Sequence, residues 1–559
     1  MTASLLIPPC VALFAGAAIL GVAQGRIRTA TMLVAPLVAL GLVWLTPDTS
    51  WNIGSWLGHD LVLVRGDRLS RWFGTVFSIM AFAGGLFALN QPNRLEISAA
   101  QAYAGGALGV VFAGDLITTF VFWEVMALAS TAVVWSGGPE NRQAGLRYLV
   151  MHLFGGVLLM IGIAGEIQAT GSAAFTAMQP DSLARWLILA GFLINAGAPP
   201  LSAWLPDAYP RASYSGMVVL SAFTTKTSVF VLLRGFPGAE VLIWIGLFMV
   251  FYGIVYAILE NDMRRILAYS IVNQVGFMIT GIGIGTQLAL NGAAAHAFAH
   301  IIYKALLLMS AGSVLYMTGR SKCTQLGGLF RSMKLTTVCG IIGALAISAV
   351  PLTSGFVTKS MIGSAAEARH LALVWYLLAA GSAGVFLHAG IKFPWFVFFQ
   401  RDSGLRPADP PWNMRAAMVL LSVLCLLFGM VPGILYRFRP FNATYEPYTA
   451  THVISQSQLL LFSGLAFFLL LGLLRRTPTI TLDFDWFYRA LGPAIWRRLV
   501  ASSEMAWRRA GGVTRAIWTW AMIRFERFGR DGLMARSQAS GTMALFAVAM
   551  LATFLFAAL

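Results

Sequence analysis

Lysine is rare in this 559-residue chain, and four of its six lysines lie inside or at the edge of long apolar stretches. These four are Lys226, Lys304, Lys359 and Lys392. Arginine, which supplies all the other basic residues, stays charged almost anywhere, whereas a buried lysine can lose its proton. Arginine-favouring residue usage explains the surface arginines but not lysines placed where charge is expensive. Their placement therefore predicts a pathway for protons or other ions.

Two histidines accompany one of these lysines at helical spacing. His296, His300 and Lys304 follow one another at intervals of four residues, which puts three titratable groups on one helical face, about 6 Å apart per step. A histidine pair with this spacing also suits zinc, but no carboxylate in the same helix completes a metal site. Because histidine titrates near neutral pH, a proton relay along this face is the better interpretation. No metal and no other cofactor is expected.

Glu124 and Lys226 each lie well inside an apolar run. Glu124 directly follows Trp123, and an isolated carboxylate in such surroundings must be protonated or paired. Lys226 is too deep to extend easily to the membrane surface. His152 and Arg147 stand near the start of their run, where they are interpreted as anchors.

The last two lysines differ in how strongly they indicate function. Lys359 follows a proline-containing interruption, whereas Lys392 has His388 one turn before it and lies near the end of its run. Lys392 could therefore simply extend to the membrane surface. Taken together, the titratable groups form a candidate relay at one membrane depth, in which loading one site changes the proton affinity of the next by charge repulsion.

Two apolar runs are interrupted by residues that break helices. The first run, 184–210, contains Pro199, Pro200 and Pro206, and the second run, 336–365, contains Pro351, Ser354 and Gly355. Proline removes a backbone donor and frees carbonyl groups that lipid cannot satisfy. A kink against a neighbouring helix explains either break alone. Two such breaks, each near a polar or charged residue, instead indicate helices that line a hydrated cavity.

The elements that must position these residues are membrane-spanning helices. The chain is 58% hydrophobic and only 11% charged, and apolar runs of about 20 residues recur almost throughout it, which excludes a soluble globular protein. The net charge of +17 resides in short connections, so it does not predict nucleic-acid binding. The four cysteines are scattered without metal-ligand spacing, and no nucleotide-binding glycine motif occurs.

The expected fold is an all-α polytopic membrane protein with about 14–16 transmembrane helices. Predicted spans lie near 6–23, 29–46, 72–90, 101–114, 116–136, 148–168, 184–210, 216–234, 240–260, 266–286, 289–317, 336–365, 371–399, 416–435, 457–474 and 541–559. Basic residues concentrate in alternate connections, whereas 169–183 and 235–239 contain none. The positive-inside rule places the basic connections in the cytoplasm and both chain ends outside it.

The pattern changes from about residue 481 to residue 537. Ten arginines between Arg489 and Arg536 alternate with tryptophans, and a last apolar run then follows. This composition suits an amphipathic helix in the membrane interface, although a helical hairpin packed on a partner protein fits equally well. The last run is predicted to be a terminal transmembrane anchor.

Three motifs in order resemble the proton-conducting antiporter-like membrane subunit family. The motifs are Pro200-Leu-Ser-Ala-Trp204-Leu-Pro206-Asp207-Ala, His296-x3-His300-x3-Lys304-Ala-Leu-Leu, and Gly327-Gly328-Leu with Pro351-x2-Ser354-Gly355-Phe-x2-Lys359. The family includes the D and A subunits of Mrp-type cation/proton antiporters and the antiporter-like subunits of respiratory complex I. The resemblance covers roughly residues 100–400, and the sequence is closer to the Mrp D type.

The resemblance implies a fold with two inverted five-helix repeats, each containing a broken helix. It divides the chain into N-terminal helices (1–100), a first repeat (101–235), a second repeat (240–400), C-terminal helices (401–480) and the basic segment with its anchor (481–559). On the family pattern Glu124 is the key glutamate and Lys226 is the lysine after the first break. His300 and Lys304 are then the central connecting residues, and Lys359 is the lysine after the second break.

One residue departs from the family pattern. Relatives usually carry a lysine five residues before the Pro200 position, paired with the glutamate, and this chain has Asn195 there. An amide does not exchange a proton at physiological pH, so the partner of Glu124 is missing or is supplied differently. Because the other titratable groups remain, we expect Lys226 to take over as the partner.

The leading function is a proton-translocating subunit of a multi-subunit Mrp-type antiporter in the bacterial inner membrane, with Na⁺ as the expected exchanged cation. It is expected to be a transport protein with other membrane subunits as partners, not an enzyme. An alternative is a proton-pumping subunit of a redox complex such as complex I or a membrane hydrogenase. A third is an assembly subunit, or one for inorganic-carbon uptake, whose coupling is altered by Asn195.

Overall fold

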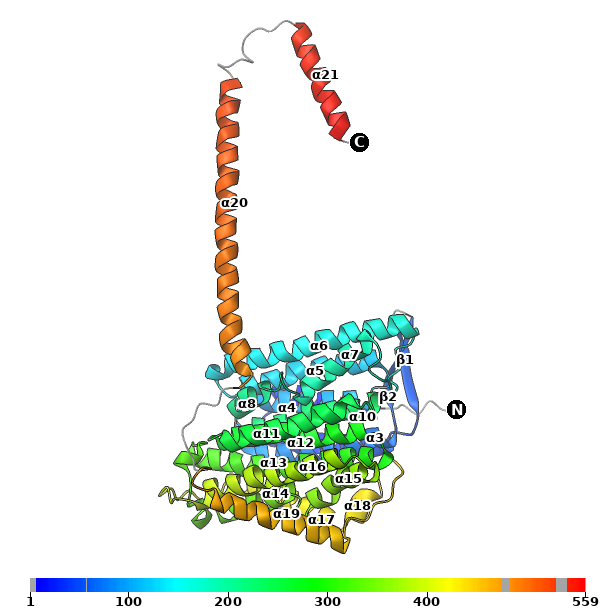
Figure 1. The fold of residues 1–559 in the computed structure, drawn as a ribbon, viewed down its shortest axis with the longest axis vertical. Coiled ribbons are helices and arrows are strands. Elements are labelled where there is room, and N and C mark those ends of the chain that lie inside the picture. Colours follow the sequence, from blue (N-terminus) through cyan, green and yellow to red (C-terminus); the bar gives the residue numbers. More distant parts are fainter. Residues whose placement is uncertain (1–6, 57, 475–482, 529–539, 558–559) are drawn as a thin grey trace. The chain divides into compact units, whose positions relative to one another are not determined.

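A computed structural model describes residues 7–56, 58–474, 483–528 and 540–557 of the chain (Figure 1). The chain forms two units, Met1–Phe484 and Asp485–Leu559. The predicted boundary at residue 481 itself lies outside the described residues. The expectation of an all-α polytopic membrane protein is confirmed, because helices make up nearly all of the regular structure that is described.

The first unit contains most of the helices. Its first part consists of α1 (Pro9–Val22), α2 (Gly25–Leu45), β1 (Ser50–Trp56), β2 (His59–Arg65), α3 (Arg68–Phe87), α4 (Arg94–Phe112), α5 (Leu116–Trp135) and α6 (Arg142–Thr170). Its middle part consists of α7 (Leu183–Ala196), α8 (Trp204–Ala208), α9 (Gly216–Ala222), α10 (Thr224–Gly235), α11 (Val241–Leu259), α12 (Met263–Ile284) and α13 (Gln287–Thr318). Its last part consists of α14 (Lys334–Ile347), α15 (Ser354–Ala368), α16 (Ala372–Val385), α17 (Trp412–Met430), α18 (Pro432–Tyr436) and α19 (Ala450–Leu469).

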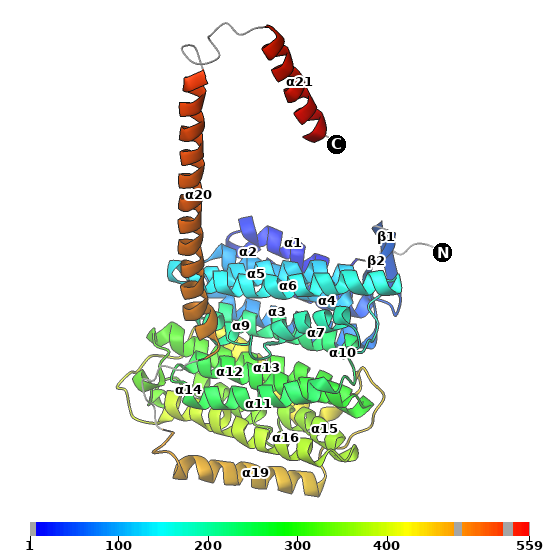
Figure 2. The same ribbon diagram turned by 45° about the horizontal axis from the view of Figure 1, so that its top comes forward.

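Twelve helical stretches among the described residues are long and apolar enough to span a membrane. This number is below the predicted 14–16 because α7 and α14, the first pieces of the two broken runs, are short, as are α1 and the apolar part of α21 (Ser540–Ala557). The long helices lie roughly parallel and stack in rows from α6 to α19 (Figures 1 and 2).

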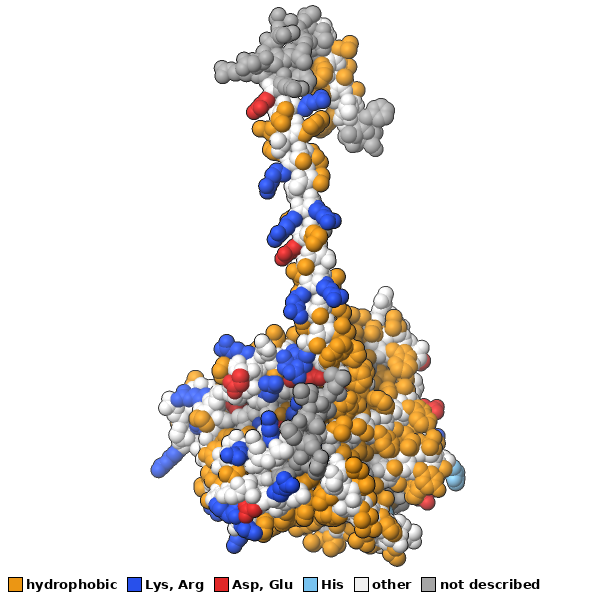
Figure 3. All heavy atoms as spheres, turned by 60° about the vertical axis from the view of Figure 1, so that its left-hand side comes forward, with side chains coloured by type: hydrophobic (Ala, Val, Ile, Leu, Met, Phe, Trp, Pro, Cys, Tyr) orange, Lys and Arg blue, Asp and Glu red, His pale blue; other side chains and the backbone are white. Residues whose placement is uncertain are grey.

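The bundle is sorted into buried and lipid-facing helices. The spans of α9–α10 and α12 are completely buried and α13 is 94% buried, whereas only 17% of the α19 span is buried. Outer helices such as α6 expose large apolar side chains along one face. Hydrophobic side chains cover a wide area of the surface, with Lys and Arg side chains gathered beside it (Figure 3). Exposed apolar surface of this extent is stable only in contact with lipid or other subunits.

Both proline-containing runs are interrupted. Helix α7 ends at Ala196, and the chain passes through Pro199 and Pro200 before α8, which contains Pro206. Helix α14 ends at Ile347, and α15 begins at Ser354 after a connection that contains Pro351. Gly355 is required here, because a Cβ at this position would lie 1.8 Å from the carbonyl oxygen of Ala346. The close approach lets the two half-helices overlap.

Two further departures from regular α-helix were not predicted. The run 216–234 is divided at Phe223 into α9 and α10, although no proline or glycine lies at the division. The run 371–399 continues after α16 as two π-helical segments, Phe386–Lys392 and Trp395–Phe399. Mid-helix deviations of this kind are frequent at functional sites because they release backbone groups from the regular ladder.

A short β-hairpin is the other unpredicted element. Strands β1 and β2 pair antiparallel between α2 and α3. The hairpin is joined to the bundle by Asp115, whose side chain accepts hydrogen bonds from the backbone N–H groups of Val62 and Thr118, both at 2.7 Å. Asp115 therefore caps α5 and fixes the entry of the helix that carries Glu124.

The second unit consists of helices only among its described residues. It contains a π-helical segment, Phe487–Leu491, followed by α20 (Gly492–Phe528) and α21. Helix α20 carries arginines and tryptophans along its length. Two of the ten arginines, Arg530 and Arg536, lie outside the described residues.

Candidate functional site

Helix α13 presents its three titratable side chains to α12 and α15. His296, His300 and Lys304 are all fully buried. His296 Nε2 lies 3.0 Å from Oε1 of Gln274, and the Lys304 Nζ donates to Oγ of Ser270 at 2.9 Å. The helical spacing read from the sequence therefore produces a row of polar groups inside the bundle, where neighbouring helices supply neutral hydrogen-bond partners.

His300 stands at the centre of this row. Both of its ring nitrogens are buried and have no hydrogen-bond partner among the described residues. It lies within electrostatic range of Lys226 on α10, of His296 and Lys304 on α13, and of Lys359 on α15. The structure thus places four of the other six predicted titratable residues within electrostatic range of one imidazole.

Lys226 and Lys359 make equivalent contacts at two helix interruptions. The Lys226 Nζ donates to the carbonyl oxygen of Ser221 at 2.6 Å, in the last turn of α9, and to Oγ1 of Thr225 at 3.0 Å. The Lys359 Nζ donates to the carbonyl oxygen of Ile347 at 3.4 Å, at the end of α14. Helix ends leave carbonyl groups without an intrahelical partner, and each lysine occupies such a position. Within the described residues, no ion pair fixes the charge of either lysine.

A cavity with both polar and apolar lining residues lies beside Lys359. The cavity has a volume of 530 Å³, and its wall includes Lys359, Glu367, Glu446 and His452. The Lys359 Nζ also lies 4.6 Å from the ring centroid of Phe277. The contact with the Phe277 face favours the charged amine, and Lys359 lies between the buried row and this cavity.

Lys392 lies at the edge of the row, and its side chain binds backbone carbonyl groups at the end of a neighbouring helix. Its Nζ donates to the carbonyl oxygens of Ala257, Ile258 and Glu260 at the end of α11, at 3.1 Å for Ala257 and 2.6 Å for Glu260. His388, one turn earlier, lies within electrostatic range of both Lys304 and Lys392. The lysine therefore caps a helix C-terminus, where a cation is favourable.

We expect Lys392→Met to reduce stability more than transport. The substitution removes a charged donor from three buried carbonyl groups, which corresponds to a loss of about 2–4 kcal/mol. The check is a thermal unfolding midpoint for the purified complex, measured beside the transport rate. Lys392→Arg, which keeps the cation, is the matched control. A midpoint unchanged in Lys392→Met together with complete loss of transport would contradict the capping role.

Glu124 lies apart from the lysine row. Its Oε1 atom is buried and has no hydrogen-bond partner among the described residues. It packs directly on α6 at Gly156, where a Cβ atom would lie only 2.0 Å from Oε1. No hydrogen bond or ion pair joins it to Lys226 in the described part of the chain, although the sequence favoured Lys226 as its partner.

The position of the missing lysine is occupied by a histidine–amide pair. Asn195 is buried at the end of α7, and its Oδ1 lies 2.7 Å from Nδ1 of His152 on α6. The His152 ring packs against Tyr148 at 4.1 Å and Trp204 at 4.6 Å between ring centroids. His152 is fully enclosed by protein and does not face lipid, so its interpretation as an anchor is wrong. In the sequence, the only sign of this deeper position is that His152 follows Arg147 by five residues.

Buried hydroxyl groups lie between this pair and Lys226. The Tyr148 hydroxyl donates to Ser130 at 3.0 Å, and it lies close to Tyr103 and Thr224. The Tyr103 hydroxyl accepts a hydrogen bond from the backbone N–H of Thr224 at 2.7 Å. Thr224 directly precedes Thr225, the hydroxyl partner of Lys226. The sequence gave no signal for this cluster, because its members come from four separate helices.

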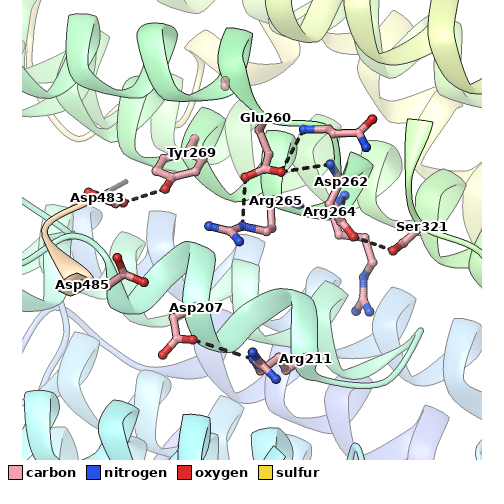
Figure 4. Close-up of polar contacts among 12 residues, drawn as sticks. Asp207, Arg211, Glu260, Asp262, Arg264, Arg265, Tyr269, Ser321, Asp483 and Asp485 are labelled. Atoms are coloured by element: carbon pink, nitrogen blue, oxygen red, sulfur yellow. Dashed lines mark hydrogen bonds and ion pairs between the residues drawn. The ribbon is translucent and has the colours of Figure 1, made fainter. Parts of the chain in front are cut away.

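Ion pairs occupy the helix ends on the side of the basic connections. Arg147 binds Asp207 through two hydrogen bonds, 2.7 and 2.9 Å long, and so joins α6 to α8. Figure 4 shows Arg265 paired with Glu260 at 3.0 Å, and the hydroxyl of Tyr269 donating to Asp483 at 2.6 Å. The charges of Arg147 and Arg265 are each paired with a carboxylate, and Asp483 accepts a hydrogen bond from a tyrosine hydroxyl, so these groups fix helix ends and do not extend the buried row.

The fold and the site define the class of protein. Long apolar helices with interrupted spans enclose a buried row of lysine and histidine side chains, an arrangement typical of membrane proteins that move ions through their interior.

The chain belongs to the NADH:quinone oxidoreductase/Mrp antiporter family of membrane proteins. The sequence pattern of this family matches residues 113–386. It is 32% identical over 341 residues to the D subunit of the Na⁺/H⁺ antiporter of Alkalihalophilus pseudofirmus, covering 56% of this chain and 68% of that protein. It is 30% identical over 382 residues to the A/B subunit of a probable K⁺/H⁺ antiporter of Rhizobium meliloti, covering 63% of this chain but only 37% of that longer relative. The resemblance inferred from the motifs is confirmed.

Two solved structures share the fold. A chain of the membrane-bound sulfane sulfur reductase, an archaeal respiratory membrane complex, matches with a TM-score of 0.71 and 22% identity over 98% of this chain and 99% of its own length. A chain of the Mrp complex from Dietzia sp. DQ12-45-1b matches with a TM-score of 0.65 and 21% identity, covering 81% of this chain and 95% of its own.

Proposed function

We propose that the chain is the proton-translocating subunit of a multi-subunit cation/proton antiporter of the Mrp type, with Na⁺ as the exchanged cation. It works with other membrane subunits in a bacterial inner membrane and is a transport protein, not an enzyme. The relationship to the D-type and A/B-type antiporter subunits supports this assignment.

The observation that carries the proposal is the environment of His300. A fully buried imidazole with both nitrogens free of protein partners among the described residues, surrounded by Lys226, Lys304 and Lys359, is poorly explained by a purely structural role. Buried polar groups without partners are destabilising unless water or function requires them. A relay needs such a group, because one ring nitrogen accepts a proton while the other releases one.

The proposed relay runs from α10 to α15. A proton leaves the Lys226 ammonium for the neutral Lys304 amine, and the Lys304 ammonium then gives a proton to one nitrogen of His300, which leaves two neutral amines and an imidazolium. The other His300 nitrogen then passes a proton toward His296 and Lys359, and the imidazole becomes neutral again. Because like charges at this spacing repel in a medium of low dielectric constant, loading one site favours release from the next. The cavity at Lys359 supports exchange of the proton with water.

A second candidate function is a proton-pumping subunit of a redox-driven complex. It is favoured by the fold match to the sulfane sulfur reductase chain, which extends over 98% of this chain and therefore includes most of Asp485–Leu559. The match to the Mrp complex chain covers 81%. In this case the relay is the same, and electron transfer in a partner supplies the driving force.

Reconstitution of the native complex tests the proposal. The complex is purified in mild detergent, its subunits are identified by mass spectrometry, and it is placed in vesicles that contain a pH-sensitive dye. We expect a Na⁺ gradient to drive proton movement, and Lys304→Met to lower its initial rate about 100-fold, because proton transfer through a positioned side chain is lost. Choline in place of Na⁺ is the control.

Each alternative gives a different result in this experiment. Iron–sulfur proteins among the co-purified subunits, with no cation-driven proton movement, would assign the chain to a redox complex. Full transport in Lys304→Met, with the complex intact, would remove the relay and leave an assembly or inorganic-carbon role for the chain.

A further inference from the structure

We propose that His152 is a proton-binding site that replaces the lysine missing at position 195. This inference rests on the proposed function, since it names the partner of Glu124 in the first half of the relay. The proton is carried on Nε2 of the ring, and Asn195 holds the ring in the orientation that leaves this atom free.

The hydrogen bond to Asn195 determines which nitrogen of His152 can act. Asn195 Oδ1 is an acceptor, so Nδ1 of His152 carries the hydrogen and donates across the 2.7 Å contact. In the neutral ring Nε2 then has the free lone pair. This atom is buried and has no hydrogen-bond partner among the described residues. Asn195 does not titrate, but it orients a side chain that does, as partners of functional histidines commonly do.

Glu124 approaches the same face of α6 one turn away. Its unpartnered Oε1 lies on Gly156, four residues after His152, and residues four apart share a helical face. Glu124, on α5, thus contacts α6 at a residue that lies four positions from His152, a rise of ~6 Å along the helix axis. We infer that a water bridges Glu124 Oε1 and His152 Nε2. Gly156 makes the approach possible, since any side chain would occupy the place of the carboxylate.

Other groups around His152 do not compete for this role. Tyr148 and Trp204 hold the ring by aromatic contact, and the Arg147 guanidinium is engaged by Asp207 through two hydrogen bonds. Lys226 binds the carbonyl of Ser221 and the hydroxyl of Thr225 and is therefore engaged elsewhere.

The proposed step is a proton transfer that conserves charge. The Glu124 carboxyl releases a proton to His152 Nε2 through the bridging water, which leaves a carboxylate and an imidazolium. The imidazolium keeps its Nδ1–H on Asn195 and later returns to the neutral ring by releasing the Nε2 proton. The hydroxyl cluster of Tyr148, Tyr103 and Thr224 lies between His152 and Lys226 and provides the onward route.

Exchange of the two residues tests the inference in the reconstituted complex. His152→Gln keeps a donor for Asn195 but cannot be protonated, and we expect it to lower the initial transport rate at least about tenfold. In the double variant His152→Gln/Asn195→Lys, the added lysine supplies a titratable group, and the rate is expected to recover to at least about half of the wild-type value. His59→Gln, on the surface hairpin, is the control and should transport normally.

A second variant tests the orientation. Asn195→Ala keeps His152 but removes the acceptor of its Nδ1–H, and we expect a decrease of about fivefold, the equivalent of one hydrogen bond. This result is informative even if His152→Gln fails to assemble, and a wild-type rate in assembled Asn195→Ala would overturn the orienting role.

The outcomes separate this inference from the proposed function. Wild-type transport in assembled His152→Gln would overturn the inference, and so would a double variant that assembles but stays as inactive as His152→Gln. In either case, loss of transport in Lys304→Met would leave the proposed function standing. If Lys304→Met also transports normally, both fail.

Discussion

Lys226→Ala is expected to abolish proton-coupled transport while the complex still assembles. Lys226 is fully buried on α10 and lies within electrostatic range of His300 and Lys304, so it joins the first half of the chain to the central row. Alanine leaves no titratable group at this depth. We expect the initial rate in vesicles to decrease about 100-fold or more, since a positioned proton carrier contributes this much in other systems.

Lys334→Ala is the matched control for this variant. Lys334 is exposed at the start of α14, so its removal changes the net charge by the same amount but leaves the buried row intact. Lys226→Arg gives a second comparison. Arginine keeps the positive charge but does not release its proton, so transport should remain low, because the proposed role needs a proton that leaves. Normal flux in assembled Lys226→Ala would exclude a relay through α10.

The sequence predicted the spans and the two proline breaks for a simple physical reason. An apolar run of membrane length has few alternatives to a helix, and proline at Pro200 or Pro351 interrupts a helix by its own geometry. The spacing of His296, His300 and Lys304 is equally local, so their shared face followed from helical periodicity. The structure places this face inside the bundle. The relay role of these residues stays a prediction.

Features that depend on contacts between distant segments were not predicted. The division at Phe223 has no proline or glycine to signal it, and the threonines beside Lys226 are only weak helix formers. The π-helical segments after α16 lie on either side of Pro394, and a proline predicts a disturbed helix there but not the π-helical form that the disturbance takes. The hairpin between α2 and α3 was not recognised in a sequence dominated by helical runs.

The partner of Glu124 shows the same limitation at the level of the site. The sequence made the absence of a lysine at Asn195 obvious, and it suggested Lys226 as the partner because the other titratable groups of the family pattern remain. It could not show that His152, on a different helix, lies 2.7 Å from the amide. A histidine near the start of a span is usually an anchor, and only the approach of α6 and α7 distinguishes the two cases.

Glu124→Gln is expected to have an effect as large as that of Lys226→Ala. Glutamine has almost the same shape, so packing on Gly156 is retained, but it can neither bind nor release a proton. We therefore expect the initial transport rate to decrease about 100-fold, with normal assembly. Glu140→Gln, in an exposed connection, is the control. Unchanged transport in Glu124→Gln would show that the first half of the chain no longer takes part in coupling.

Gly156→Ala distinguishes the charge of Glu124 from its position. The added Cβ would lie 2.0 Å from Oε1, so the carboxylate must move although it remains titratable. Gly155→Ala is a milder neighbour on the same helix, because its Cβ would lie 3.3 Å from the nearest atom, in Ile194. If the position next to His152 matters, Gly156→Ala reduces transport nearly as much as Glu124→Gln, whereas Gly155→Ala retains most of it. Equal transport rates in the two glycine variants would show that displacing the Glu124 carboxylate does not affect transport. The contact of Glu124 with this face of α6 would then not be required.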